Sequence, residues 1–138
     1  MSLGLSNTGE LALLREYFAN HSVEFGVYND STDNLQDGDT VADISTEPTG
    51  SNYSRQSVTN SDVTITLDAN SENALLVVSP QPFEVSDSSQ KIDAGFLYNP
   101  ADDFFVRIPV DTSSYPNDYI DLAQLDNLNL GGEAVTLD

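Results

Sequence analysis

The clearest set of possible metal ligands lies in one short acidic segment. Residues 29–39 contain four aspartates, namely Asp30, Asp33, Asp37 and Asp39. Carboxylate oxygens at this spacing suit Ca²⁺ or Mg²⁺, although an EF-hand loop would place a bidentate Glu at its twelfth position. A loop of hydrated carboxylates within a diffuse cloud of Na⁺ or K⁺ has the same kind of sequence. We therefore expect no resident cofactor, and we keep the four aspartates as weak candidate ligands for these cations.

Side chains suited to catalysis are scarce. A nucleophilic triad needs an imidazole base, and the single histidine, His21, follows a predicted helix whose last carbonyls it is suited to bind. Glycoside hydrolysis needs a carboxylic acid in an apolar cleft. The nearest approach is Glu84 beside Phe83, and strand alternation places Glu84 toward solvent. No P-loop, dinucleotide-binding or HExxH motif occurs, so we predict that the protein is not an enzyme.

Acidic residues dominate the composition. Sixteen Asp and seven Glu stand against three Arg and one Lys, which gives a formal net charge of −19 in 138 residues. Such a surface repels itself in dilute buffer, but the Debye length falls from about 10 Å at 0.1 M salt to about 3 Å at 1 M. The carboxylates are dispersed among six Phe and six Tyr, unlike those of an acidic disordered tail. The composition indicates a folded protein adapted to molar salt.

The same composition excludes several partners. The basic residues are scattered, so no basic patch is available for nucleic acid or for an anionic membrane. No apolar run approaches the roughly 20 residues of a transmembrane helix. The chain also does not open with a basic region followed by an apolar stretch. We expect neither membrane insertion nor a signal peptide, and we expect synthesis in the cytoplasm.

One amphipathic helix is predicted near the start of the chain, over about residues 9–20. The apolar positions at helical spacing are Leu11, Leu14 and Phe18, and the expected N-cap is Asn7 or Thr8. Leu13 and Tyr17 extend the apolar surface onto an adjoining face, which is more than one sheet contact needs. We therefore treat Leu13 and Tyr17 as candidate interface residues.

After the helix the periodicity changes to two. Residues 23–27 and 62–68 are typical of half-buried strands with one solvated face, and residues 74–78 of a strand covered on both faces. Further strands are expected over residues 53–59, 82–86, 91–98, 104–108 and 133–137. This pattern predicts a mostly β fold, a β-sandwich or jelly-roll-like domain with one short N-terminal α-helix. The length fits a single domain over residues 1–138, with the sandwich at about 22–138.

One motif is more specific than the others. Gly50 is followed by Tyr53, Arg55 and Gln56. Residues two apart on a strand share a face, so Tyr53 and Arg55 are expected side by side, with the guanidinium free to bind a carboxylate or carbonyls. This motif resembles one in a family of small virion proteins of tailed phages, often labelled tail fibre or minor structural proteins. Members have a short helix, a strand and an acidic turn, then a glycine closely followed by Tyr-x-Arg-Gln.

The resemblance extends over about residues 10–138. It includes an apolar Gly-hydrophobic-Tyr strand at residues 95–98 and a closing polar turn and strand at residues 128–137. The acidic segment 29–39 is longer than the family pattern, and residues 111–126 look like an insertion.

The resemblance implies a structural virion protein with no catalytic residues. Together with the salt adaptation, it predicts a capsid-surface decoration or turret protein, or a tail protein, of a tailed virus that infects a halophilic archaeon. The implied partners are other virion proteins, further copies in a symmetric homo-oligomer, and the host cell surface. Tyr115 and Tyr119 are further candidate interface residues. Several alternatives stay open. They are a secreted or cell-surface module of a halophile that binds carbohydrate or Ca²⁺, a host-attachment module of the virion, a small hydrolase, and a halophilic cytoplasmic domain of another role.

Overall fold

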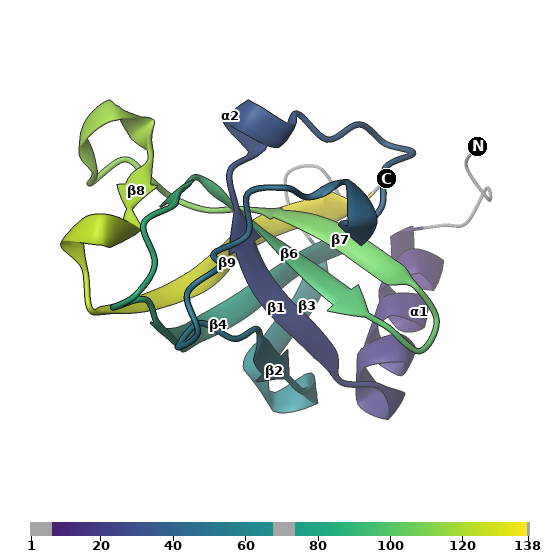
Figure 1. The fold of residues 1–138 in the computed structure, drawn as a ribbon. Coiled ribbons are helices and arrows are strands. Elements are labelled where there is room, and N and C mark those ends of the chain that lie inside the picture. The colour runs from purple at the N-terminus through teal and green to yellow at the C-terminus, as the bar shows by residue number, and fades with distance from the viewer. Residues whose placement is uncertain (1–6, 68–73, 138) are drawn as a thin grey trace.

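The protein is mostly β, with three antiparallel sheets and one N-terminal helix of several turns (Figure 1). The computed structural model describes residues 7–67 and 74–137. The predicted β-sandwich-like fold with a short N-terminal helix is confirmed. The short helical segments are α2 (Asp30–Asp33), η1 (Val41–Asp43), η2 (Asn60–Asp62), η3 (Pro116–Asp118) and η4 (Leu122–Gln124).

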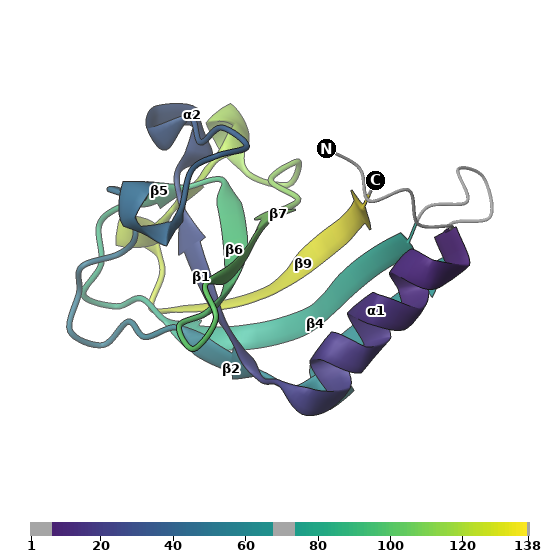
Figure 2. The same cartoon turned by 90° about the vertical axis from the view of Figure 1, so that its right-hand side faces the viewer.

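Helix α1 (Asn7–Asn20) packs against strands β3 (Val63–Leu67) and β4 (Ala74–Glu84). Figure 2 shows the helix running beside β4. It begins earlier than predicted, so Asn7 and Thr8 fall inside the helix and do not precede it as a cap. Its apolar stripe buries Leu14 and Phe18 in the core. None of the helices in the described part of the chain is long and apolar enough to cross a membrane.

The first sheet has the strand order β2-β1-β6-β7. Its strands are β1 (Val23–Tyr28), β2 (Gln56–Val58), β6 (Ala94–Asn99) and β7 (Phe104–Pro109). The predicted strand over residues 91–98 is interrupted at Asp93, which separates β5 (Lys91–Ile92) from β6. Strand β5 forms a small separate sheet with β8 (Ile120–Asp121).

The second sheet has the order β3-β4-β9. Its strands are β3 (Val63–Leu67), β4 (Ala74–Glu84) and β9 (Asn127–Leu137). The predicted strands over residues 74–78 and 82–86 are thus mostly one long strand, although Pro80 and Pro82 lie inside it. Register shifts against β9 on both sides of Val78 accommodate the interruption.

Two predictions about strand burial are wrong. Residues 74–78 are not covered on both faces, because Val77 is 37% exposed on the outer face that it shares with Thr64 across the pair. Conversely, the second face of β1 is largely covered, although Glu24 on that face stays partly exposed. Phe25 and Val27 pack in the core between the sheets, while Tyr28 packs with Leu35 and Phe96 in a second cluster on the opposite face. The long segment between β1 and β2 provides that second cover.

Candidate functional site

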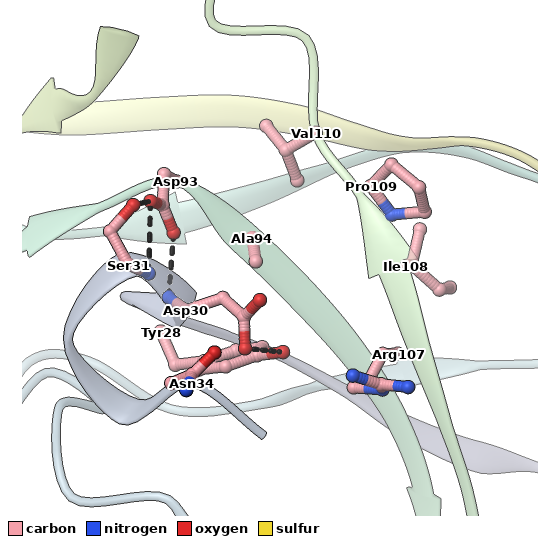
Figure 3. A pocket seen from close by; sticks show the side chains of 10 residues that line it. All are labelled: Tyr28, Asp30, Ser31, Asn34, Asp93, Ala94, Arg107, Ile108, Pro109 and Val110. Carbon is pink, nitrogen blue, oxygen red and sulfur yellow. Dashed lines mark hydrogen bonds between the residues drawn. The ribbon is translucent and has the colours of Figure 1, made fainter. Parts of the chain in front are cut away.

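A broad hollow of about 730 Å³ lies between the segment after β1 and strand β7 (Figure 3). Its polar wall carries the carboxylates of Asp30 and Asp93 and the guanidinium of Arg107. Its apolar side is made by Ile108, Pro109 and Val110. The hollow is the place where the acidic segment predicted as a cation loop meets the first sheet.

Asp93 fixes the start of this segment. One of its carboxylate oxygens accepts a hydrogen bond from the Asp30 backbone N–H at 2.7 Å. The other accepts from the Ser31 backbone N–H at 3.3 Å and from the Ser31 hydroxyl. The Asp93 backbone N–H in turn donates to the Tyr28 carbonyl at 3.1 Å. Both Asp93 oxygens therefore bind the protein's own backbone and side chains (Figure 3).

Asp30 has an equally structural role. Its Oδ1 accepts hydrogen bonds from the Tyr28 hydroxyl at 3.2 Å and from the Leu35 backbone N–H at 3.1 Å. Burial raises the pKa of Tyr28, and the neighbouring Asp30 carboxylate raises it further. The Tyr28 phenol thus stays protonated and serves as a hydrogen-bond donor.

Arg107, which lies on β7, binds the segment between β1 and β2. It donates to the Leu35 carbonyl at 2.6 Å and to Asp37 Oδ1 at 2.9 Å. The Asp37 side chain is fully exposed, so this ion pair contributes little to stability. The contact with the Leu35 carbonyl is the one that ties the segment to the sheet.

The remaining candidate ligands point to other places. Asp33 accepts hydrogen bonds from the backbone N–H groups of Ser45 at 3.1 Å and Thr46 at 3.2 Å. Burial raises the pKa of Asp33, but these and the hydroxyl hydrogen bonds outweigh it and lower the pKa overall. Asp39 accepts from the Gln36 backbone N–H at 2.7 Å.

The structure thus does not bring the four aspartates together. Asp30, Asp33 and Asp39 each bind a different piece of backbone, and Asp37 pairs with Arg107. In residues 7–67 and 74–137 no three His, Cys, Asp or Glu side chains are grouped to hold a metal ion. The other candidates for chemistry also have local roles. His21 Nδ1 lies 2.9 Å from the Tyr17 carbonyl at the end of α1, as predicted, and Glu84 is exposed at the end of β4.

A second polar cluster forms around Arg55. Its Nε and Nη2 donate to the two carboxylate oxygens of Glu47, each at 2.9 Å, and its Nη1 donates to Glu24 at 2.9 Å. The Tyr53 hydroxyl donates to the same Glu47 carboxylate at 2.8 Å. The predicted fixing of Arg55 by a carboxylate beside Tyr53 is confirmed. Both residues precede β2, however, so they meet through Glu47 and are not neighbours on one strand face.

The Arg55 cluster is packed as well as paired. The guanidinium lies over the Phe96 ring, 5.1 Å from its centroid. A Cβ at Gly26 would lie 2.3 Å from the Phe96 ring and 3.0 Å from Glu47, so a side chain is excluded there. Gln56, the third residue of the motif, donates only to the nearby Ser54 carbonyl among the contacts of its side chain in the described chain. The motif therefore joins the 44–55 segment to the first sheet.

The four candidate interface residues differ in exposure. Leu13 is 57% exposed on the outer face of α1. Tyr17 stacks on Phe104 with ring centroids 4.4 Å apart, and its hydroxyl donates to Asp102 at 2.9 Å. Tyr115 and Tyr119 are half-buried in the segment between β7 and β9. Of the four, Leu13 is the one left most available for another molecule.

Sequence reasoning missed two organising carboxylates. Asp93 binds Asp30 and Ser31, which are distant in sequence, whereas Glu47 binds Tyr53 and Arg55, which follow it by six and eight residues. Neither spacing forms a recognisable pattern. The sequence contained two local signs of these roles. Asp93 interrupts an apolar strand, and Glu47 begins the turn that precedes Tyr53.

No protein-family model, no curated protein and no solved structure matches the chain.

Proposed function

We propose that the chain is a non-enzymatic structural component of a tailed-virus virion, located on the capsid surface or in the tail, and adapted to molar salt. In this proposal it acts as a symmetric homo-oligomer that docks on other virion proteins. The observation that carries it is the use of the polar groups. The carboxylates around the hollow and around Arg55 bind the protein's own backbone and side chains, and the Ser31 hydroxyl, which donates to Asp93, is part of this structural arrangement.

The salt adaptation is supported by the small number of ion pairs. Within the described residues, three salt bridges occur, at Arg55 with Glu24, Arg55 with Glu47 and Arg107 with Asp37. Three carboxylates thus have a basic partner in the described residues, and four basic residues cannot balance the 23 acidic ones of the sequence. Repulsion among these charges destabilises the compact state unless salt screens it.

The virion assignment is supported by the resemblance at Tyr53, Arg55 and Gln56. The residues of this motif have a structural role in the present fold, and a structural role is what the resemblance implies. A small protein without a catalytic site gains function through repetition, because symmetric copies turn weak contacts into avid ones. Leu13 on the outer face of α1 is the proposed contact.

Two experiments test the proposal. Electron microscopy of purified virions labelled with an antibody against the chain should show regular labelling of the head, neck or tail. The mass in molar KCl should be that of an oligomer, and Leu13→Ser should shift it toward the monomer. Val77→Thr is the matched control, because Val77 is also exposed but lies on the outer sheet face. Unlabelled virions, or a clean wild-type monomer at high micromolar concentration, would contradict the proposal.

A further inference from the structure

A smaller hollow of about 300 Å³ lies in the segment that connects β7 to β9. Tyr115 and Tyr119 provide two of its walls, and Asn117, Asp121 and Gln124 provide polar groups. Its volume is at the lower end of the range for small-molecule sites. This hollow, which we call the tyrosine pocket, is separate from the hollow at Asp93 and Arg107.

The polar groups of the tyrosine pocket differ from the carboxylates of the hollow at Asp93. Within the described chain, the hydroxyls of Tyr115 and Tyr119 and the side-chain amides of Asn117 and Gln124 make no hydrogen bond. Asp121 is the exception, since its Oδ1 accepts from the Ala123 backbone N–H at 3.1 Å. By contrast, the carboxylates that line the hollow at Asp93 are occupied by the protein itself. The groups in the tyrosine pocket are thus available to a ligand.

The backbone of the tyrosine pocket is also held in an unusual conformation. Asn117 and Asp118 both have positive φ angles, of 66° and 62°. Two successive left-handed residues without glycine are unfavourable, and such strain gathers at binding sites. The turn places Asn117 between the two tyrosines in the sequence and at the wall of the pocket.

We propose that the tyrosine pocket binds a neutral saccharide. Phenol hydroxyls and side-chain amides both donate and accept hydrogen bonds, as sugar hydroxyls do. Aromatic rings provide flat apolar surface for the C–H faces of a sugar ring. The combination of two rings with two free amides matches this ligand class better than it matches an apolar molecule.

Charge decides in favour of a neutral ligand. Lys91 Nζ lies 5.2 Å from the centroid of the Tyr119 ring, and Lys91 is paired with Asp121 across the small sheet. Asp121 and the net charge of −19 repel an anion, and the ammonium group beside the Tyr119 ring opposes a second cation at that ring. This step rests on the proposed function, which places the protein in molar salt. Attraction between separated charges is screened there, whereas hydrogen bonds and ring stacking act at short range and persist.

Saturation-transfer NMR in molar KCl tests the proposal on the isolated protein. The probes are neutral mono- and disaccharides of glucose, galactose, mannose and N-acetylglucosamine, with sialic acid and a proline-rich peptide as competitors. We expect transfer to the ring protons of at least one neutral sugar. Gln124→Ala should weaken its binding about two- to tenfold, and Tyr119→Ala should weaken it about tenfold or more.

The controls separate binding from folding. Gln36→Ala removes an exposed amide outside the tyrosine pocket and should leave sugar binding unchanged. Tyr119→Phe keeps the ring, and so the fold, while it removes the hydroxyl; it should still lower affinity. Absence of transfer to every neutral sugar, equal binding of sialic acid, binding of the peptide alone, or affinity unchanged in Gln124→Ala and Tyr119→Phe would each overturn the proposal. Sugar binding by a chain that does not label virions would refute the proposed function and leave this inference standing.

Discussion

Removing the Arg55 guanidinium should destabilise the fold by about 2–4 kcal/mol. In Arg55→Ala, Glu47 loses two charge-assisted hydrogen bonds and Glu24 loses one. The Glu47 side chain is 21% exposed, so water replaces the lost donors poorly. A polar group left without its partner costs about 1–3 kcal/mol, and more when it is charged. The lost contact with the Phe96 ring adds about 0.5–1 kcal/mol.

Urea unfolding in molar KCl, followed by circular dichroism, measures this loss without changing the ionic strength. A double-mutant cycle with Glu47→Gln isolates the pair, because the second substitution removes the stranded charge. The double variant should therefore be more stable than the sum of the single effects predicts. Asp37→Asn is the control, since it breaks an exposed ion pair and should change stability by less than about 0.5 kcal/mol. A change below about 0.5 kcal/mol for Arg55→Ala as well would refute the reasoning.

Four further predictions follow from the same contacts and from the charge. Lowering salt from molar to about 0.1 M should lower the melting temperature or unfold the protein, whereas a flat profile would remove the salt argument. Gly26→Ala should destabilise by about 1–3 kcal/mol in thermal unfolding, because the new methyl group would overlap the Phe96 ring. Burial raises the pKa of Asp33, but hydrogen bonds lower it overall, so the contribution of this carboxylate to folding stability should be lost as pH falls through the folded pKa. In molar salt, the free energy of unfolding should therefore drop below about pH 4, and it should drop less steeply in Asp33→Asn. Asp62→Ala should cost about 0.5–1.5 kcal/mol because it removes the hydrogen bond to the Thr59 backbone N–H, while Asp126→Ala, at an exposed position, should cost close to nothing in the same melting assay.

Local periodicity predicted most of the elements. Helix α1 follows from the spacing of Leu14 and Phe18, and β1 and β3 follow from alternation. The cover over the second face of β1 did not follow from alternation, because it comes from Leu35, Val41 and Ile44 in the segment between β1 and β2, which has no regular pattern. The continuity of β4 through Pro80 was also missed, since proline normally marks the end of a strand and here a register shift accommodates it.

The polar sites were predicted less well than the strands. The density of aspartates in residues 29–39 suggested one shared site, but a carboxylate can bind a backbone amide as readily as a cation. In the structure Asp30, Asp33 and Asp39 bind backbone amides. Asp93, which completes the arrangement, comes from far along the chain. Arg55 was easier, because a lone arginine beside a tyrosine in so acidic a chain was certain to find a carboxylate within reach.

The preference for Asp over Glu has a physical reason in this fold. An aspartate is short enough to accept a hydrogen bond from a backbone N–H two or three residues away, as Asp39, Asp62 and Asp111 do at 2.7, 2.9 and 2.9 Å. In molar salt, exposed ion pairs are screened, whereas a hydrogen bond to a neutral amide is short-ranged and is not. A carboxylate in this position thus stabilises a turn and at the same time keeps its charge in contact with water. Both properties are useful in brine, and neither requires a basic partner, which is consistent with a fold that contains four basic residues.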